Sequence, residues 1–485
     1  MAANKIIRER FLEKYAEPEA QELWRLWQRK NALQNPEQEP NPIQTVPEFV
    51  RFFVLPAFDE SIESLSEFLS MPSDGGLLSI WVLNAPESAS DEESARTLAV
   101  FEHFLKELDA RLVADVVSGN VSDLAPDPLS EQAFGRCYLA ELSKEHYLLL
   151  VDRCSVGRRI GAKQGVGLAR KIGADIAVAM SCGDSCGETG ARWIHFCDAD
   201  VRLPPEYFRI TDRFQIRDAA ASGSARAKGI RKALPSALIY PFQHHGSDGL
   251  ELESELYDFK LRYYVEQLAQ AGSPYAYHAL GSTMCINIDD YCKVRGVPKR
   301  PAGEDFYLLN KLAKLNGIVS LRQPKLAILG RDSQRVPFGT GPALRKIAQH
   351  ESALQDYRYY HPQSFKELGS LLFVLDNNAA HLDSQTFVSG IEHALLEYPV
   401  LMRVLAILGF ERYLAHCRKQ RLSGDKALRA FHDWFDAFLT LKFIHACRDE
   451  FYRDVPISDL LSLGAFLSDG LLEQYERIQH NWSVI

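Results

Sequence analysis

The sequence predicts an α/β fold, with strands and helices in alternation, followed by an all-helical C-terminal region. Short apolar runs bounded by turn residues recur between residues 51 and 329, and their lengths suit strands. Longer segments with helical periodicity lie between them, and this alternation is typical of a mixed, mainly parallel, Rossmann-like sheet with flanking helices. From about residue 344 the strand signals fade, and residues 361–485 show only helical periodicity.

The expected elements follow from these runs and from the turn residues between them. Strands are expected at 51–55, 77–83, 147–151, 193–200, 237–242, 277–288 and 321–329. Helices are expected at 61–69 and 250–271, and in two segments that end near residues 111 and 180. The expected C-terminal helices are 365–375, 385–396, 400–420, 424–450 and 457–479.

Three domains are expected along the chain. Residues 1–47 form a helical arm, with Pro18 as a break, and a linker rich in Pro, Asn and Glu. Residues 48–343 form the α/β domain, and residues 344–485 form the helical domain. The arm is interpreted as a packing or dimer helix, so both helical ends are candidates for a homo-oligomer contact.

Composition narrows the function classes. A formal net charge of -9 argues against a nucleic-acid partner. No stretch reaches the roughly 20 apolar residues of a membrane span, and the first residues lack the apolar core of a signal peptide. Nine cysteines, an odd number at irregular spacing, favour free thiols and a reducing cytoplasm.

Asp198 and Asp200 are the pair on which the functional prediction rests. They follow an apolar run that begins at Trp193, and Pro204 and Pro205 end the extended segment. Because side chains alternate along a strand, both carboxylates are expected to point the same way. Adjacent carboxylates stay ionised more readily with a cation between them, and oxygen ligands favour Mg²⁺ or Mn²⁺. The alternative is an ordinary surface tripeptide.

A glycine-rich segment, residues 155–170, leads into the helix after the third expected strand. Glycine allows close approach to an anion, and a helix start offers free N–H groups, so the segment suits a diphosphate. Arg158 and Lys163 add positive charge. The spacing matches neither a Walker loop nor a dinucleotide fingerprint, and a plain glycine-rich turn is the alternative.

A second acidic pair begins the helix that follows residue 303. Glu304 and Asp305 stand at its first positions. An acid at a helix start is often only a cap for free N–H groups. The functional alternative is a catalytic base that faces the same cleft as Asp198 and Asp200.

Histidines and arginines after two later strands are further candidates. His244 and His245 follow the strand at 237–242 and could bind metal or substrate, although solvated loop histidines are more common. Arg331 and Arg335 lie in a glycine-containing segment. That segment suits either a phosphate-covering lid or an exposed loop.

The order and spacing of these motifs resemble those of family-2-type nucleotide-sugar glycosyltransferases, which have the GT-A fold. The similarity covers about residues 48–340 and leaves both ends of the chain unexplained. Residues 194–200 are also similar to the mannosylglycerate synthases, a group of retaining relatives. The matching pieces are Val54-Leu55-Pro56-Ala57-Phe58-Asp59-Glu60, the 163–170 region, Asp198-Ala199-Asp200 with residues 203–208, and Gly303-Glu304-Asp305.

The resemblance implies an enzyme that moves a sugar from a UDP- or GDP-linked donor to an unidentified hydroxyl acceptor. Asp198 and Asp200 would hold Mn²⁺ or Mg²⁺, which binds the diphosphate. In an inverting enzyme Asp305 would be the general base, with Glu304 as the alternative. The residues expected to contact the donor are Pro56, Asp59, Glu60, Asn84, Arg158, Lys163, Arg170, Arg331 and Arg335.

The sequence departs from the family pattern in two places. Family members often carry an Asp after the second strand that contacts the base or ribose, and here the matching residue is Asn84. Relatives often supply a histidine to the metal after the last strand, where this chain has Arg331 and Arg335. Either His244 or His245, or else water, would then complete the metal shell.

Two other functions remain as alternatives. A sugar-nucleotide nucleotidyltransferase shares the general fold, but it needs a glycine- and arginine-containing loop after the first strand, and residues 56–59 lack one. A catalytically silent nucleotide-sugar-binding scaffold is the other alternative. Such a scaffold would bind a nucleotide and release none.

Overall fold

The structure is a computed structural model of the chain. The residues that it describes are 2–28, 41–71, 75–117, 133–182, 193–215, 234–246, 249–330 and 339–482.

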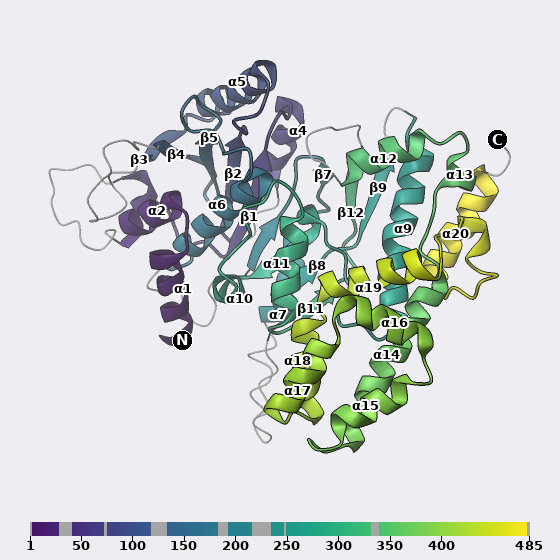
Figure 1. Cartoon of the computed structure of the whole chain (residues 1–485). Coiled ribbons are helices and arrows are strands. Elements are labelled where there is room, and N and C mark those ends of the chain that lie inside the picture. The colour runs from purple at the N-terminus through teal and green to yellow at the C-terminus, as the bar shows by residue number, and fades with distance from the viewer. Residues whose placement is uncertain are drawn as a thin grey trace. The chain divides into compact units, whose positions relative to one another are not determined.

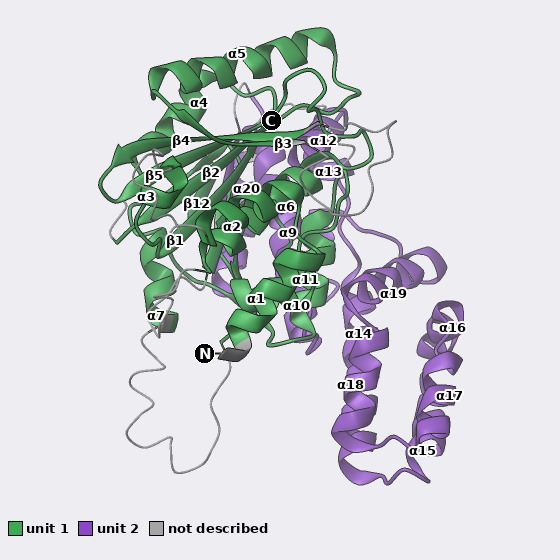
Figure 2. Ribbon diagram, turned by 90° about the vertical axis from the view of Figure 1, so that its left-hand side faces the viewer, with its two compact units in different colours: residues 1–242, 279–328 green, residues 243–278, 329–485 purple. Residues whose placement is uncertain are grey.

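The chain divides into two compact units (Figure 2). Unit 1 comprises Met1–Phe242 and Ala279–Ile328, and unit 2 comprises Gln243–His278 and Leu329–Ile485. These boundaries differ from the domains expected from the sequence. The N-terminal helices belong to unit 1, and the segment 243–278 belongs to unit 2.

Unit 1 is built on a nine-stranded sheet with the order β11-β8-β10-β6-β1-β2-β5-β4-β3. The strands described in it run in one direction except β10 and β4, so a mixed, mainly parallel α/β architecture is confirmed. Separately, β7 pairs with β12 in antiparallel fashion, Arg202 with Ala327 and Val201 with Ile328. The strands are β1 (Arg51–Ala57), β2 (Leu77–Asn84), β3 (Arg111–Val117), β4 (Ala133–Ser143), β5 (His146–Arg153), β6 (Trp193–Phe196), β7 (Val201–Arg202), β8 (Ala237–Ile239), β9 (Phe242–Gly246), β10 (Met284–Asn287), β11 (Ile318–Ser320) and β12 (Leu326–Gly330).

Three strands of the large sheet, β3, β4 and β11, were not expected from the sequence. The expected helix to about residue 111 ends at Glu107, and β3 begins at Arg111. β3 lies at one edge and β11 at the other, and β11 is three residues long, with Val319 and Ser320 exposed. A strand that buries little apolar surface carries a weak apolar pattern, so the sequence does not mark the two edge strands.

Helices cover both faces of the sheet in unit 1 (Figure 1). Val54 and Ile80 are partners on neighbouring strands, and so are Leu55 and Trp81, and successive side chains face opposite ways. Helix α6 lies against Val54, because a Cβ built on its Gly173 would come within 2.5 Å of Val54 Cγ1. Helix α5 lies against Trp81, whose ring meets Phe104 edge-on at 5.3 Å between centroids. The two helices therefore pack on opposite faces.

The remaining helices of unit 1 surround this arrangement. They include the helices expected from the sequence near the N-terminus and after residues 60, 90, 164 and 303. The helices are α1 (Ala2–Lys14), α2 (Pro18–Gln28), α3 (Pro42–Thr45), α4 (Ile62–Ser66), α5 (Asp91–Glu107), α6 (Gly165–Met180), α7 (Asp212–Gln215), α10 (Ile288–Lys293) and α11 (Glu304–Ala313).

A buried polar cluster attaches the N-terminal helices to α6. Asp175 of α6 is fully buried and accepts hydrogen bonds from Lys171 Nζ at 2.6 Å, Tyr291 Oη at 2.7 Å and the Glu17 N–H at 2.8 Å. Lys171 also donates to the Tyr15 carbonyl at 2.8 Å. Buried charges are tolerated when they are paired and hydrogen-bonded in this way. The arm is thus an integral part of unit 1.

Unit 2 is predominantly helical, and the expected helix at 250–271 is confirmed as α9. Phe259 and Tyr263 of α9 pack against Tyr359 and Phe365 in its apolar core. The helices are α9 (Glu251–Gln270), α12 (Thr340–Ala348), α13 (Ala353–Asp356), α14 (Pro362–His381), α15 (Phe387–Leu395), α16 (Pro399–Leu408), α17 (Glu411–Gln420), α18 (Gly424–Trp434), α19 (Ala437–Glu450) and α20 (Asp469–Trp482).

Two long helices expected in unit 2 are each broken in two. The expected helix at 400–420 ends at Gly409, which adopts a left-handed conformation with φ 78° and caps α16. Glycine adopts this conformation without a steric penalty. The expected helix at 424–450 is interrupted before Asp436, whose side chain accepts from the N–H groups of Phe438 and Leu439 and so starts α19.

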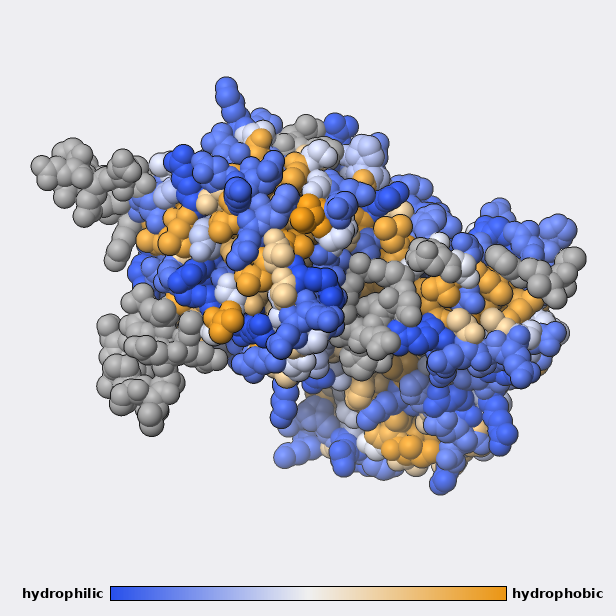
Figure 3. Space-filling model, turned by 90° about the horizontal axis from the view of Figure 1, so that it is seen from above, coloured by the Kyte–Doolittle hydropathy of each residue, from blue (hydrophilic) through white to orange (hydrophobic). Residues whose placement is uncertain are grey.

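Polar side chains cover most of the face shown in Figure 3, with apolar side chains in small groups between them. Such scattered apolar groups are normal on protein surfaces. Among the described helices, none combines the length and the apolar character needed to cross a bilayer.

The Asp175 cluster predicts a large effect of one substitution. Asp175→Ala should lower the free energy of unfolding by about 3–5 kcal/mol, because Lys171 then loses its buried counter-charge. Urea denaturation measures this value. The matched control is Glu92→Ala, since the Glu92 side chain is 90% exposed and should contribute less than about 0.5 kcal/mol. Equal effects of the two substitutions would show that the cluster does not hold the arm.

Candidate functional site

The topology of the large sheet marks the carboxyl ends of β1 and β6 as a ligand-binding position. This side of the sheet, where those strands end, is the edge meant below. After β1 the chain adds β2 and β5 on one side, and it then returns to add β6 on the other side of β1. β1 and β6 are parallel, and the Cys197 N–H continues their pairing by donating to the Val54 carbonyl at 3.1 Å. Open α/β sheets bind ligands beyond the carboxyl ends of strands at such a reversal. The residues that follow β1 and β6 meet at this edge.

Asp198 and Asp200 lie at this edge, but in a turn. The sequence placed them on the strand itself, and that was wrong, because β6 ends at Phe196. The Val201 N–H donates to the Asp198 carbonyl at 3.2 Å, so residues 198–201 form a turn. The expectation that both side chains share a face because of strand alternation therefore has no basis. Both side chains are partly exposed.

Arg170 of α6 joins Asp198 to the start of α11. Its Nη2 donates to Asp198 Oδ1 at 2.5 Å, and its Nη1 donates to Glu304 Oε1. Arg170 is 4% exposed and Glu304 is 2% exposed, whereas the Asp198 side chain is 35% exposed. A guanidinium can bind two carboxylates at once through its planar array of donors. The buried bridge thus fixes Asp198 at the boundary with solvent.

Gly281 makes room for this bridge. It begins the short helix η6 (Gly281–Thr283), and a Cβ built on it would lie 2.4 Å from Arg170 Cζ. No real Cβ approaches a guanidinium carbon so closely, so any other residue at 281 would displace Arg170. In the sequence Gly281 lies within the strand expected at 277–288, and nothing near it indicates this role.

The site has more negative than positive charge. Asp305, next to Glu304, is partly buried, and its Oδ1 accepts from the Phe306 N–H at 2.6 Å. Burial and the charge of Glu304 raise the pKa of Asp305 to about 7. Burial alone would lower the pKa of Arg170, but the charges of Asp198, Glu304 and Asp305 outweigh it and raise the pKa above its usual value.

The start of α6 packs against the segment 298–301 of the same unit. The Gly167 N–H donates to the Arg300 carbonyl at 3.0 Å, and a Cβ on Gly165 would lie 2.5 Å from Pro301 Cα. These glycines therefore permit close approach of the segment 298–301. The Arg300 carbonyl occupies one of the helix-start N–H groups that were expected to bind a diphosphate. Lys163, just before α6, is exposed, and its predicted phosphate contact stays a prediction.

The residues expected to contact the donor after β1 have structural partners. Pro56 is buried within β1. Asp59 has φ 54° and accepts two hydrogen bonds from Arg96 of α5, at 2.7 and 3.0 Å. Glu60, which follows it, is partly buried. The sequence does not mark Arg96, because an arginine on an amphipathic helix carries no local signal.

Asn84 and Arg158 differ in their surroundings. Asn84 ends β2, is 5% exposed, and its Oδ1 has no hydrogen-bond partner in the part of the chain that the structure describes. It is therefore a buried acceptor that a ligand N–H or O–H could satisfy. Arg158 is buried and already used, because it donates to Asp115 at 2.7 Å and to the Phe134 carbonyl at 2.5 Å.

The predicted histidines belong to unit 2. His244 is buried; its Nδ1 is 2.5 Å from Asp258 Oδ1, and its Nε2 is 3.1 Å from Thr340 Oγ1. His245 is exposed. Their role as metal ligands stays a prediction, and Arg331 and Arg335 lie outside the described residues.

Comparison with protein-family models and with curated proteins finds no match to this chain.

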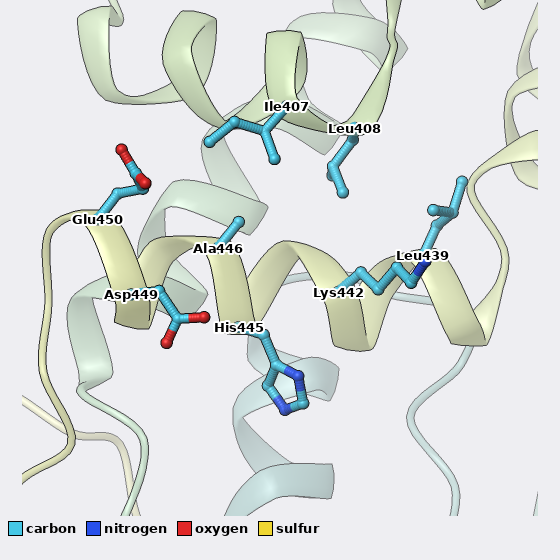
Figure 4. Close-up of a pocket in the computed structure, with 8 residues that line it drawn as sticks. All are labelled: Ile407, Leu408, Leu439, Lys442, His445, Ala446, Asp449 and Glu450. Carbon is cyan, nitrogen blue, oxygen red and sulfur yellow. The ribbon is translucent and has the colours of Figure 1, made fainter.

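Two further features bear on possible sites. Within the described ranges, no group of three or more His, Cys, Asp or Glu side chains is arranged to hold a metal ion. A pocket of about 350 Å³ lies in unit 2 between α16 and α19 (Figure 4). None of the residues predicted for the site lines it. Its lining consists of Ile407, Leu408, Leu439, Lys442, His445, Ala446, Asp449 and Glu450.

The raised pKa of Asp305 predicts a pH-dependent stability. Between its ordinary value of 3.8 and about 7, the unfolded chain loses this proton while the folded chain keeps it. Stability therefore falls as the pH rises across this window. Asp305→Asn cannot titrate, so its free energy of unfolding should exceed that of the parent by more than about 1 kcal/mol at neutral pH, one pKa unit being about 1.4 kcal/mol.

Urea denaturation of both proteins from acidic to neutral pH measures the difference. It should be smallest at the acidic end and should grow with pH. Asp425→Asn, an exposed position on α18, is the control and should show a constant difference. A difference for Asp305→Asn that does not change with pH would contradict the assignment of a raised pKa.

Proposed function

We propose that the protein is a divalent-metal-dependent glycosyltransferase whose unit 1 is a GT-A-type domain of the family-2 kind. The observation that carries the proposal is the bridge from Arg170 to Asp198 and Glu304. It links an acid after β6 to the acids that start α11, at the edge where the topology favours a ligand. A mixed, mainly parallel sheet flanked by helices and the motif resemblance both support this proposal.

The donor set at this edge suits a hard divalent cation. The nearby ligands are carboxylate oxygens, which Mg²⁺ and Mn²⁺ prefer. Asp198, Glu304 and Asp305 share one buried guanidinium, so negative charge is in excess. Asp198 reaches solvent, and it would hold the ion together with Asp200. When bound, the ion would neutralise the leaving diphosphate of a UDP- or GDP-linked sugar.

Four residues of the site have defined roles in the proposed transfer. The acceptor hydroxyl oxygen bonds to the anomeric carbon of the donor, and the bond from that carbon to the diphosphate oxygen breaks. Asp305, in its ionised form, takes the hydroxyl proton as general base. The Glu304 carboxylate is already hydrogen-bonded to Arg170, so Asp305 is the preferred base. Arg170 keeps Asp198 in position during the reaction.

Asn84 would contact the donor on the other side of β1. Its unpartnered Oδ1 can accept a hydrogen bond from the base or the ribose of the nucleotide.

A nucleotide-sugar-binding scaffold without turnover is the second candidate. The observation in its favour is that Arg170 already neutralises part of the charge on Asp198. A glycosyltransferase releases nucleoside diphosphate, whereas a scaffold binds the nucleotide sugar and releases none.

The test is a panel of UDP-, GDP- and dTDP-sugars with Mn²⁺ or EDTA, in which free nucleoside diphosphate is measured. One donor should be hydrolysed slowly in a metal-dependent reaction. Asp198→Ala and Asp200→Ala should reduce this rate at least about 100-fold, because each removes a proposed metal ligand. Asp305→Asn should retain donor binding and lose transfer to an acceptor.

Asp383→Ala, an exposed acid of unit 2, serves as the matched control and should keep the parental rate. Donor binding without any release would favour the scaffold. Normal turnover of Asp198→Ala would remove the proposed metal site.

A further inference from the structure

A group of cations lies beside α11 in unit 1. Arg295, Arg300 and Lys311 are all exposed, and none of them has an ion-pair partner within the described ranges. Their neighbours differ, because Lys293 is paired with Asp290 at 2.7 Å and Lys299 with Glu17 at 2.8 Å. In a chain whose formal net charge is -9, unpaired cations in one place are a local exception.

Aromatic rings hold the two arginines in place. The Arg300 guanidinium lies 3.9 Å from the ring centroid of Tyr307, and that of Arg295 lies 4.8 Å from the ring of Tyr15. Stacking on a ring leaves the N–H groups of an arginine available to an anion. Tyr307 and Lys311 are neighbours on the surface of α11, since they are four residues apart.

The three cations act on one another. The pKa of Lys311 is lowered by partial desolvation of its ammonium group and by the charges of Arg295 and Arg300. Like charges in proximity repel, and a bound anion would relieve the repulsion. An arginine pair and a lysine form the recognition chemistry that suits phosphate and carboxylate groups.

This surface belongs to the same helix as the proposed base. Lys311 follows Asp305 by six residues, which corresponds to a rise of about 9 Å along the helix. Six residues also turn an α-helix by about 600°, so Lys311 faces about 120° away from Asp305, and the cationic surface lies apart from the proposed base.

We propose that Arg295, Arg300 and Lys311 form a binding surface for a small compound that carries a phosphate or a carboxylate. The anion-binding surface itself does not depend on turnover.

Calorimetric titration in EDTA with glucose, glucose 6-phosphate and glucuronate tests the surface directly. Glucose 6-phosphate or glucuronate should bind the parent protein with saturation, and glucose should bind far more weakly. Arg300→Ala and Lys311→Ala should each weaken binding of the anion at least about tenfold, since charge-assisted hydrogen bonds are lost. Lys325→Ala removes an exposed charge elsewhere in unit 1 and should leave binding unchanged.

The titrations with glucose 6-phosphate and with glucuronate show whether the surface prefers a phosphate or a carboxylate. Absence of saturable binding by both anions, or equal binding by the parent and both variants, would overturn the inference. Acceptor-free hydrolysis of the donor is measured in parallel, and Arg300→Ala and Lys311→Ala should retain it. Anion binding without hydrolysis would reject the proposed function and keep the surface, whereas hydrolysis without anion binding would reject the surface alone.

Discussion

The buried guanidinium of Arg170 is the interaction on which the candidate site of unit 1 depends. It is hydrogen-bonded to Asp198 and Glu304, which come from segments more than 100 residues apart in the chain. Buried charges of this kind are stable only when their partners are correctly placed. The bridge therefore requires that α6, the turn after β6 and the start of α11 keep one mutual arrangement, and Gly281 supplies the space for it.

The same bridge explains the electrostatics of the site. One guanidinium cannot balance the acids around it, and Asp305 shows this through its raised pKa. A base with a pKa near neutrality is well matched to proton transfer from a hydroxyl group. Excess carboxylate charge beside solvent also suits a divalent cation, so one arrangement serves both parts of the proposed chemistry.

The sequence predicted the parts of this account that depend on local pattern. The apolar runs located β1, β2, β5 and β6, and the acids at 304 and 305 correctly marked the start of α11. The edge strands β3 and β11 were missed, because they bury little apolar surface, and β4, which lies beside β3, was missed as well. The sequence correctly associated Asp198 and Asp200 with the carboxyl end of β6. It extended this strand to residue 200, however, whereas β6 ends at Phe196.

Contacts that depend on tertiary structure could not be read from the sequence. Arg170 was expected to contact the donor as part of a motif, and nothing near it in sequence indicates two carboxylate partners. The glycines at the start of α6 suggested an anion, yet at least two of them accommodate the segment 298–301. A glycine that permits close approach gives the same sequence signal whether the approaching group is a ligand or another part of the chain.

Binding of Mn²⁺ in the presence of UDP, followed by the electron paramagnetic resonance signal of the free ion, tests the central role of Arg170 most directly. Arg170→Met removes a positive charge from the site, so Coulomb attraction alone would strengthen Mn²⁺ binding. If Arg170 positions Asp198, as we propose, the variant should bind Mn²⁺ at least about tenfold more weakly while circular dichroism shows that it is folded. Tighter or unchanged Mn²⁺ binding by folded Arg170→Met would contradict this role.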